Sequence, residues 1–364
     1  MRPPALPRSA LLTILAACSF GGASGTTWGA NLFAGNGVYR IAVADGQQAH
    51  KCGVWSAITG ELHPVGPDLD VVFSINGTAS NSNYTTLRSH ATGRNYTTSQ
   101  QCSPLCIIAG QPAIEPIERD GAVAGFRLSW QFADTPAGGR GGPTVEFIQE
   151  VVIEGPFDGT QTADNTLIRE THTVVNLGPG PFRFGLRKLW DLSIGAALDP
   201  DDKNTAPWLG DCRRPWLACD RSLRLTKNGS FDGPYPPHVV FNPDPAEAAC
   251  PSGEPIEPRA CGGRPVYLVV ATVGIPSGLD PRPHPPEVLQ FNSWSVAWGS
   301  CWDAPLQDEA DCVADGLDDP GTSLAYFYGV APSSAIGLRA GQSRSFTQYL
   351  AAAESACPLL IAGD

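Results

Sequence analysis

The stretch Thr166–Gly195, TLIRETHTVVNLGPGPFRFGLRKLWDLSIG, decides the fold class of this chain. Two β-rich runs flank Gly178-Pro179-Gly180-Pro181, a cluster that cannot continue a strand and therefore predicts a hairpin loop. Because side chains alternate along a strand, one parity of the second run is expected to point at a core. That parity is apolar and is interrupted only by Lys188: Phe182, Phe184, Leu186, Trp190 and Leu192.

The opposite parity of the same stretch carries polar side chains, including Arg183. If the loop is those four residues with no bulge, His172 lies across from Arg187 and Glu170 lies one pair further along. Such a face could perform acid–base chemistry, with Arg187 binding a carboxylate or oxyanion and Glu170 or Asp191 orienting the imidazole. We therefore take four residues as the candidate catalytic set: His172, Arg187, Glu170 and Asp191.

A structural interpretation competes with this catalytic one. The same face can be the solvated outer side of a sheet, with cross-strand charge pairs that each contribute only ~0.2–1 kcal/mol. A register slip of one residue would also move His172 to the other face. We favour the structural interpretation, because spacing alone constrains side-chain geometry only loosely.

The composition indicates an acidic β-rich protein. The chain has 364 residues, and its 40 Gly and 34 Pro favour turns over helices. Its hydrophobic content of 42% is enough to bury a core. The formal net charge is −12 and no basic run is present, so we expect no nucleic acid partner, because such binding depends on Lys and Arg neutralising phosphates.

The first residues resemble an export signal. Arg2 and Arg8 precede a short apolar run that ends in Leu15-Ala16-Ala17-Cys18, which matches a bacterial lipobox. We predict a signal peptide over 1–17, a lipid anchor on Cys18 that attaches the protein to the membrane, and a tether over 18–34. The alternative is cleavage within the small-residue stretch Gly21–Gly25, which would give a secreted protein.

Apart from Cys18, the chain has ten cysteines and no CxxC motif, which favours disulfides in an exported protein over zinc binding or redox chemistry. Sequence neighbours suggest a pairing, although sequence cannot establish connectivity. The pairs expected are Cys102–Cys106, Cys212–Cys219, Cys250–Cys261, Cys301–Cys312 and Cys52–Cys357.

The order of segments predicts an all-β fold. Residues 126–153 form a second expected hairpin, in which Phe126, Leu128, Trp130 and Phe132 alternate with polar residues. Residues 199–265 are rich in Pro and Cys with little periodicity, and we interpret them as a disulfide-stapled loop insertion. The prediction is one domain over 35–364, an antiparallel β-sandwich that could reach supersandwich size.

Tryptophans are the candidate ligand-binding residues. A row of aromatic rings can stack on the apolar face of a sugar. Trp294, Trp298 and Trp302 share one parity in a single stretch, although a core role is favoured for them. Trp208 and Trp216, in the insertion, are harder to explain as core.

Oxygen-bearing side chains at short spacing form a candidate calcium site, because Ca²⁺ prefers oxygen ligands. The stretch lacks the glycine and the distal glutamate of an EF-hand loop, and a solvated acidic loop is the favoured alternative. The candidate ligands are Asp199, Asp201, Asp202 and Asn204.

The sequence contains no GxSxG, HExxH, Walker or Rossmann motif. The β-rich pattern with a His/Arg/Glu face is similar to sugar-handling supersandwich folds, a likeness of architecture that transfers no residue role. We expect an exported, lipid-anchored β-sandwich with a binding or structural role at the cell envelope, and a glycan is the candidate ligand if the role is binding. The alternative is a carbohydrate-active enzyme, a hydrolase, lyase or epimerase, that uses the His172 face.

Overall fold

The structure is a computed structural model of the chain. It describes most of the β-rich part of the sequence: residues 31–48, 51–64, 66–99, 102–135, 142–192, 195–196, 205–210, 216–217, 238–243, 268–272, 279–293, 301–302 and 322–353.

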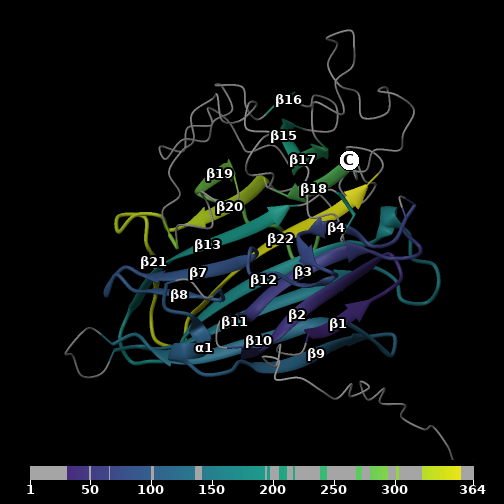
Figure 1. The fold of residues 1–364 in the computed structure, drawn as a ribbon. Helices are drawn as coiled ribbons and strands as arrows, with labels where there is room; N and C mark the ends of the chain where they lie inside the picture. Colours follow the sequence, from purple (N-terminus) through teal and green to yellow (C-terminus); the bar gives the residue numbers. More distant parts are fainter. Residues whose placement is uncertain are drawn as a thin grey trace, which may run out of the picture.

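Three antiparallel sheets make up the described fold (Figure 1). The large sheet has nine strands in the order β16-β15-β17-β18-β22-β12-β11-β10-β9. Its strands are β9 (Ala113–Arg119), β10 (Ala122–Ala133), β11 (Thr144–Glu154), β12 (Leu167–Asn176), β15 (Thr205–Gly210), β16 (Trp216–Leu217), β17 (His238–Pro243), β18 (Leu268–Thr272) and β22 (Ser343–Ala353).

The middle sheet has the order β19-β20-β13-β7-β8, with β21 paired to β13, and the small sheet has the order β1-β2-β3-β4-β14. The middle sheet contains β7 (Tyr84–Ser89), β8 (Asn95–Thr97), β13 (Phe182–Leu192), β19 (Val288–Ser293), β20 (Thr322–Tyr328) and β21 (Ile336–Leu338). The small sheet contains β1 (Asn31–Gly35), β2 (Tyr39–Gln48), β3 (Lys51–Thr59), β4 (Leu69–Val72) and β14 (Gly195–Ala196). Three short elements complete the fold: a hairpin of β5 (Ser74–Ile75) and β6 (Thr78–Ala79), the helix α1 (Leu105–Ile108) and the 3-10 turn η1 (Ala163–Asn165).

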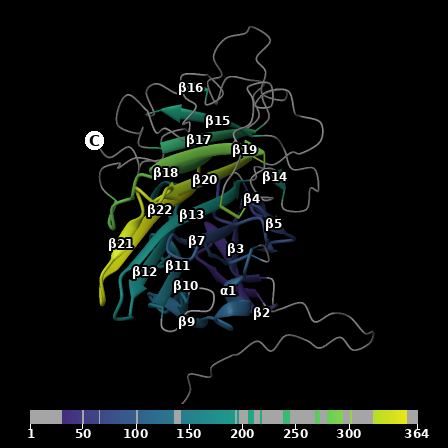
Figure 2. The same cartoon turned by 90° about the vertical axis from the view of Figure 1, so that its left-hand side faces the viewer.

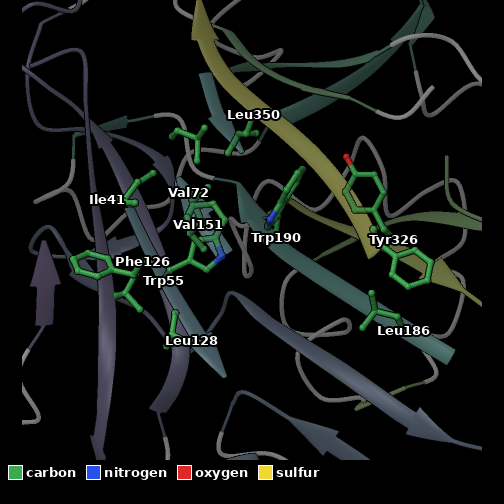
Figure 3. Packing of buried hydrophobic residues seen from close by; sticks show 14 of the residues in the cluster. Ile41, Trp55, Val72, Phe126, Leu128, Val151, Leu186, Trp190, Tyr326 and Leu350 are labelled. Carbon is green, nitrogen blue, oxygen red and sulfur yellow. The ribbon is translucent and has the colours of Figure 1, made fainter. Parts of the chain in front are cut away.

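One buried cluster joins the three sheets into a sandwich. Figure 3 shows Trp55 of the small sheet and Trp190 of the middle sheet among aliphatic side chains of the large sheet such as Val151 and Leu350. The apolar parity of the second hairpin, from Phe126 to Phe132, belongs to this cluster, and its strands pair as predicted. The prediction of an all-β antiparallel sandwich is confirmed.

The connection through Gly178-Pro179-Gly180-Pro181 is not a hairpin loop, and this part of the prediction is wrong. β12 belongs to the large sheet and β13 to the middle sheet, so the loop crosses from one layer to the other. His172 pairs with Gln149 and Phe346, and not with Arg187. Because the two strands face each other across the core, the even-numbered residues of both point inward.

Two disulfides start from one short segment and reach two distant parts of the chain. Cys106, on α1, bonds Cys52 on β3, and Cys102 bonds Cys301. The expected pairs Cys102–Cys106, Cys301–Cys312 and Cys52–Cys357 are therefore wrong, because the fold places sequence neighbours against different partners. The remaining expected disulfide residues lie outside the described residues, as does Cys18: Cys212, Cys219, Cys250, Cys261, Cys312 and Cys357.

The segment 199–265, predicted to be a loop insertion, contains strands. β15, β16 and β17 fall within it and continue the large sheet beyond β18 (Figure 2). The open edge of β18 explains this arrangement, because an unpaired buried strand edge would leave backbone donors and acceptors without partners. Across the part of the chain that the structure describes, every helix is too short or too polar to cross a bilayer.

The disulfide between Cys102 and Cys301 should contribute strongly to stability, because it closes a long loop with a sequence separation of 199. We expect Cys301→Ser to lower the free energy of unfolding by about 2–5 kcal/mol in urea titrations of the oxidised protein. Peptide mapping without reduction should recover the Cys52–Cys106 and Cys102–Cys301 peptides. Recovery of a Cys102–Cys106 peptide would contradict the arrangement.

Candidate functional site

A buried carboxylate, Glu170, lies where the three sheets meet. Its Oε1 accepts hydrogen bonds from Trp55 Nε1 at 2.7 Å and forms an ion pair with Lys188 Nζ at 3.0 Å. Its Oε2 accepts a hydrogen bond from Trp190 Nε1 at 2.7 Å. His172 Nε2 lies 3.2 Å from Oε1 and 2.8 Å from Thr85 Oγ1. We call these six residues the Glu170 centre: Trp55, Thr85, Glu170, His172, Lys188 and Trp190.

The alternation of strand side chains assembles this centre. Glu170 and His172 are on the inner face of β12, while Lys188 and Trp190 are on the inner face of β13. The ammonium of Lys188 also lies 5.3 Å from the centre of the Trp55 ring, a cation–π contact that further stabilises the charge. The six side chains are all buried, with Glu170 only 1% exposed.

Electrostatics fix the charge states of the centre. Burial alone would raise the pKa of the Glu170 carboxyl, but the nearby charges of Lys188 and His172, with hydrogen bonds from His172 and Trp190, lower that pKa to about 2. Burial lowers the pKa of Lys188 and of His172, against the opposing attraction of Glu170. Lys188 Nζ at 3.0 Å and His172 Nε2 at 3.2 Å from Oε1 are the two cationic partners that favour the charged form of Glu170.

The Glu170 centre is therefore better suited to holding the sheets together than to chemistry on a substrate. Each carboxylate oxygen is already occupied by donors, and the group is enclosed between layers. A general acid or base must reach the proton that it transfers, and here the described side chains fill that space. Of the candidate catalytic residues, the structure brings Glu170 and His172 together and adds Lys188.

Replacing the carboxylate should destabilise the protein, because Lys188 would remain as a buried charge without its partner. We expect Glu170→Gln to lower the free energy of unfolding by about 3–5 kcal/mol at pH 7 in urea titrations. The double variant Glu170→Gln/Lys188→Met should recover part of this loss. The matched control is Glu118→Gln on the exposed edge of β9, which should change stability by less than about 0.5 kcal/mol.

The same carboxylate makes stability depend on pH. Its folded pKa of about 2 lies below its ordinary value of 4.5, so its contribution of about 3 kcal/mol is present above pH 4.5 and is lost as the pH falls from 4.5 to 2. In melting experiments over this range, the wild type should lose stability more steeply than Glu170→Gln. Parallel curves for the two proteins would contradict the assignment.

Arg187 and Asp191 lie on the other face of the middle sheet, so the prediction of one shared polar face is wrong. Arg187 Nη1 donates to Tyr84 Oη at 2.9 Å, and its guanidinium lies over the rings of Tyr84 and Phe327 at 5.5 and 5.6 Å. The backbone N–H of Asp191 donates to Asn83 Oδ1 at 2.6 Å. Both side chains are buried, so neither lies on a solvated outer face either.

Trp302 is buried beside the same face, against Gly185. A Cβ on Gly185 would lie 2.5 Å from the Trp302 ring, so this contact requires glycine. The ring also packs edge-on against Phe327 at 5.9 Å and lies under the guanidinium of Arg88 at 5.6 Å. Trp302 thus has a packing role, which was the favoured sequence interpretation.

The remaining candidates are four tryptophans and the predicted calcium ligands. Trp208 lies on β15 and Trp216 on β16, on paired strands of the large sheet. Trp294 and Trp298 lie outside the described residues, as do the candidate calcium ligands Asp199, Asp201, Asp202 and Asn204. Within the described ranges, no three His, Cys, Asp or Glu side chains converge in a way that could hold a metal ion.

An open hollow on the small sheet was missed by the sequence analysis. We call it the Phe33 hollow; its volume is about 350 Å³ and its lining is Phe33, Ala34, Gly35, Gly37, Tyr39, Arg40, Thr59, Gly60, Glu61, Pro67 and Asp68. Phe33 is 49% exposed, although most large apolar side chains of the fold are buried. Arg40 Nη2 forms an ion pair with Asp68 Oδ1 at 3.4 Å at the same site.

Glycines shape this hollow. Gly35 faces Arg40 across the β1–β2 pair, and both residues line the hollow. At Gly60, an added Cβ would lie 2.2 Å from the carbonyl oxygen of Gly37, so the two turns can approach only without side chains. The cluster of glycines in 35–37 with an exposed aromatic residue was the available sequence signal.

Comparisons with known proteins concern the architecture only. No protein-family model and no curated protein matches the sequence. Among solved structures, the chain is similar to a galactose mutarotase-like protein from Lactobacillus casei, with 8% identity, TM-score 0.41, and coverage of 89% of this chain and 100% of the other.

Two further structures give similar values. A galactose mutarotase related enzyme from Lactobacillus acidophilus matches with 9% identity, TM-score 0.39, and coverage of 90% and 99%. An aldose epimerase homologue from C. elegans matches with 10% identity, TM-score 0.40, and coverage of 89% and 99%. At TM-scores below 0.5, these likenesses carry no residue role or activity to this chain.

Proposed function

We propose that this protein is an exported, lipid-anchored β-sandwich of the cell envelope that binds a carbohydrate without converting it. The observation that carries the proposal is the Phe33 hollow, which combines an exposed aromatic ring with an ion pair of planar polar groups. Sugar rings present an apolar C–H face and a rim of hydroxyls. A site for them needs both kinds of group in one concave surface.

The geometry of the hollow meets this need. Phe33 on β1 and Arg40 on β2 lie on the same face of the small sheet, one diagonal step apart, which corresponds to about 7–8 Å between their backbones. A sugar ring on Phe33 would place hydroxyls near the guanidinium of Arg40, which donates, and near the carboxylate of Asp68, which accepts. Holding the two groups in an ion pair reduces the entropy lost on binding.

Three observations support the proposal: the first argues against catalysis inside the sandwich, and the other two support a location at the envelope. The Glu170 centre, the strongest acid–base candidate, is enclosed and its carboxylate is fully engaged. Disulfides Cys52–Cys106 and Cys102–Cys301 suit an oxidising compartment outside the cytosol. The lipobox at Leu15-Ala16-Ala17-Cys18 supports attachment through Cys18.

Removing the aromatic ring should weaken glycan binding. We expect Phe33→Ala to raise the Kd for glycans found on an array by about 2- to 12-fold in calorimetric titrations, because an aromatic contact contributes about 0.5–1.5 kcal/mol. The matched control is Leu177→Ala, which removes an apolar side chain of nearly equal exposure, 48%, outside the lining. An array without hits, or equal loss in both variants, would contradict the proposal.

The enzyme alternative can be tested with the same purified protein. If the wild type converts a sugar and His172→Ala abolishes this turnover at unchanged stability, the enzyme alternative replaces the binding proposal. Metabolic labelling with a palmitate analogue, compared between the wild type and Cys18→Ser, tests the anchor separately.

A further inference from the structure

A second concave surface lies where the large and middle sheets separate at one end of the sandwich. Its volume is about 630 Å³, and we call it the β22 groove. It is bordered by the first residues of β22, by β21 and by the loop that crosses between the sheets at Pro285-Pro286. Tyr328 and Phe346, whose rings lie 4.5 Å apart, form its floor.

On the side away from β12, the first half of β22 pairs with no strand that the structure describes, and this edge faces the groove. β22 pairs with β12 from Ser343 to Leu350, but on its other side β18 pairs only from Leu350 onward, so no described strand covers the earlier residues there. Thr347 shows which groups point to that side, because its carbonyl accepts the N–H of His284 and its own N–H donates to His284 Nδ1. Since backbone groups alternate along a strand, the N–H and C=O of Ser345 and Ser343 point to the same side.

The chain itself starts to pair with this edge and then leaves it. His284 makes the bonds to Thr347, but Pro285 and Pro286 follow and have no N–H to continue the ladder. The chain then crosses to the middle sheet, where the Glu287 N–H donates to the Phe327 carbonyl. Among the described residues, the two prolines therefore leave the edge of β22 at Ser343–Ser345 without a paired strand, next to Tyr328 and Phe346.

The charges around this groove differ from those of the whole chain. The formal net charge is −12, yet Arg344 lines the groove, and Arg339 is exposed in the turn between two lining residues, Leu338 and Gln342. Glu287 is the acidic side chain of the lining, and its Oε2 accepts the N–H of Val330 at 3.0 Å. Asp280 is the other acidic residue of this loop.

We propose that the β22 groove binds an extended acidic segment of another polypeptide, which adds as a strand to β22 at Ser343–Ser345. Main-chain hydrogen bonds to an open edge provide affinity, and the aromatic floor takes alternate side chains, which is the usual mode of strand addition. The arginines select acidic side chains on the partner. This site is separate from the Phe33 hollow and does not depend on it.

The test uses a fluorescein-labelled peptide of alternating Glu and Val, ten residues long, and fluorescence anisotropy with the full protein. Two N-methylated forms of this peptide are compared: one carries N-methyl groups on the odd residues and the other on the even residues, so that each form loses the N–H groups of one strand edge. We expect one form to lose binding by about tenfold or more and the other to bind like the parent, because only one edge pairs with β22. Equal binding of both forms, equal binding of a Lys/Val peptide, or no binding of the Glu/Val peptide would overturn the proposal.

Protein variants locate the site. Ser345→Pro removes the outward N–H without touching the β12 ladder and should weaken binding about tenfold, whereas Ser345→Ala keeps that N–H and should bind within about twofold of the wild type. Because Ser345→Pro could unfold the strand end, Arg344→Glu is the second variant, and it should reverse the preference from the Glu/Val to the Lys/Val peptide. If Arg344→Glu still preferred the Glu/Val peptide, the charge argument would be overturned. As a control, Phe33→Ala in the Phe33 hollow should bind the peptide like the wild type.

Discussion

The structure depends on one buried carboxylate of the large sheet that is bonded by residues of the other two sheets. Glu170 comes from the large sheet, one of its donors from the small sheet and two from the middle sheet. A buried charge is tolerated only when it is paired and hydrogen-bonded, so the layers must keep their spacing for Glu170 to remain satisfied. Apolar burial alone would allow sheets to slide, while these bonds specify one arrangement.

Other polar contacts repeat this use of hydrogen bonds between layers. The hydroxyl of Tyr39 on the small sheet donates to the carbonyl of Ala352 and accepts from its N–H, at 2.9 and 2.8 Å. The carboxylate of Asp134, after β10, accepts hydrogen bonds from Ser89, Thr92 and Tyr96 of the middle-sheet region. Each contact joins residues far apart in the sequence, and together they fasten the layers of the sandwich to one another.

The sequence predicted the strands and their inward faces better than their partners. Alternation correctly placed Phe182 to Leu192 in the core, because a period of two is a local property. Whether Gly178–Pro181 turns within a sheet or crosses between sheets depends on distant strands. The sequence analysis assumed a hairpin within one sheet, and this assumption wrongly paired Arg187 with His172. Lys188 was dismissed as an interruption of the apolar face, although a single cation there signals a buried partner. The predicted disulfide pairs were wrong for the same reason, because cysteines close in sequence need not be close in space.

The bond between Cys102 and Cys301 has a topological consequence. The whole of 199–265 lies between these two cysteines, as do β9 to β19. A protease that cuts the backbone anywhere in that interval would leave both products covalently joined, and the closing strand β22 would stay attached to the N-terminal half. Changes of length within this interval, or a single cut in it, therefore do not release the strands that complete the sandwich.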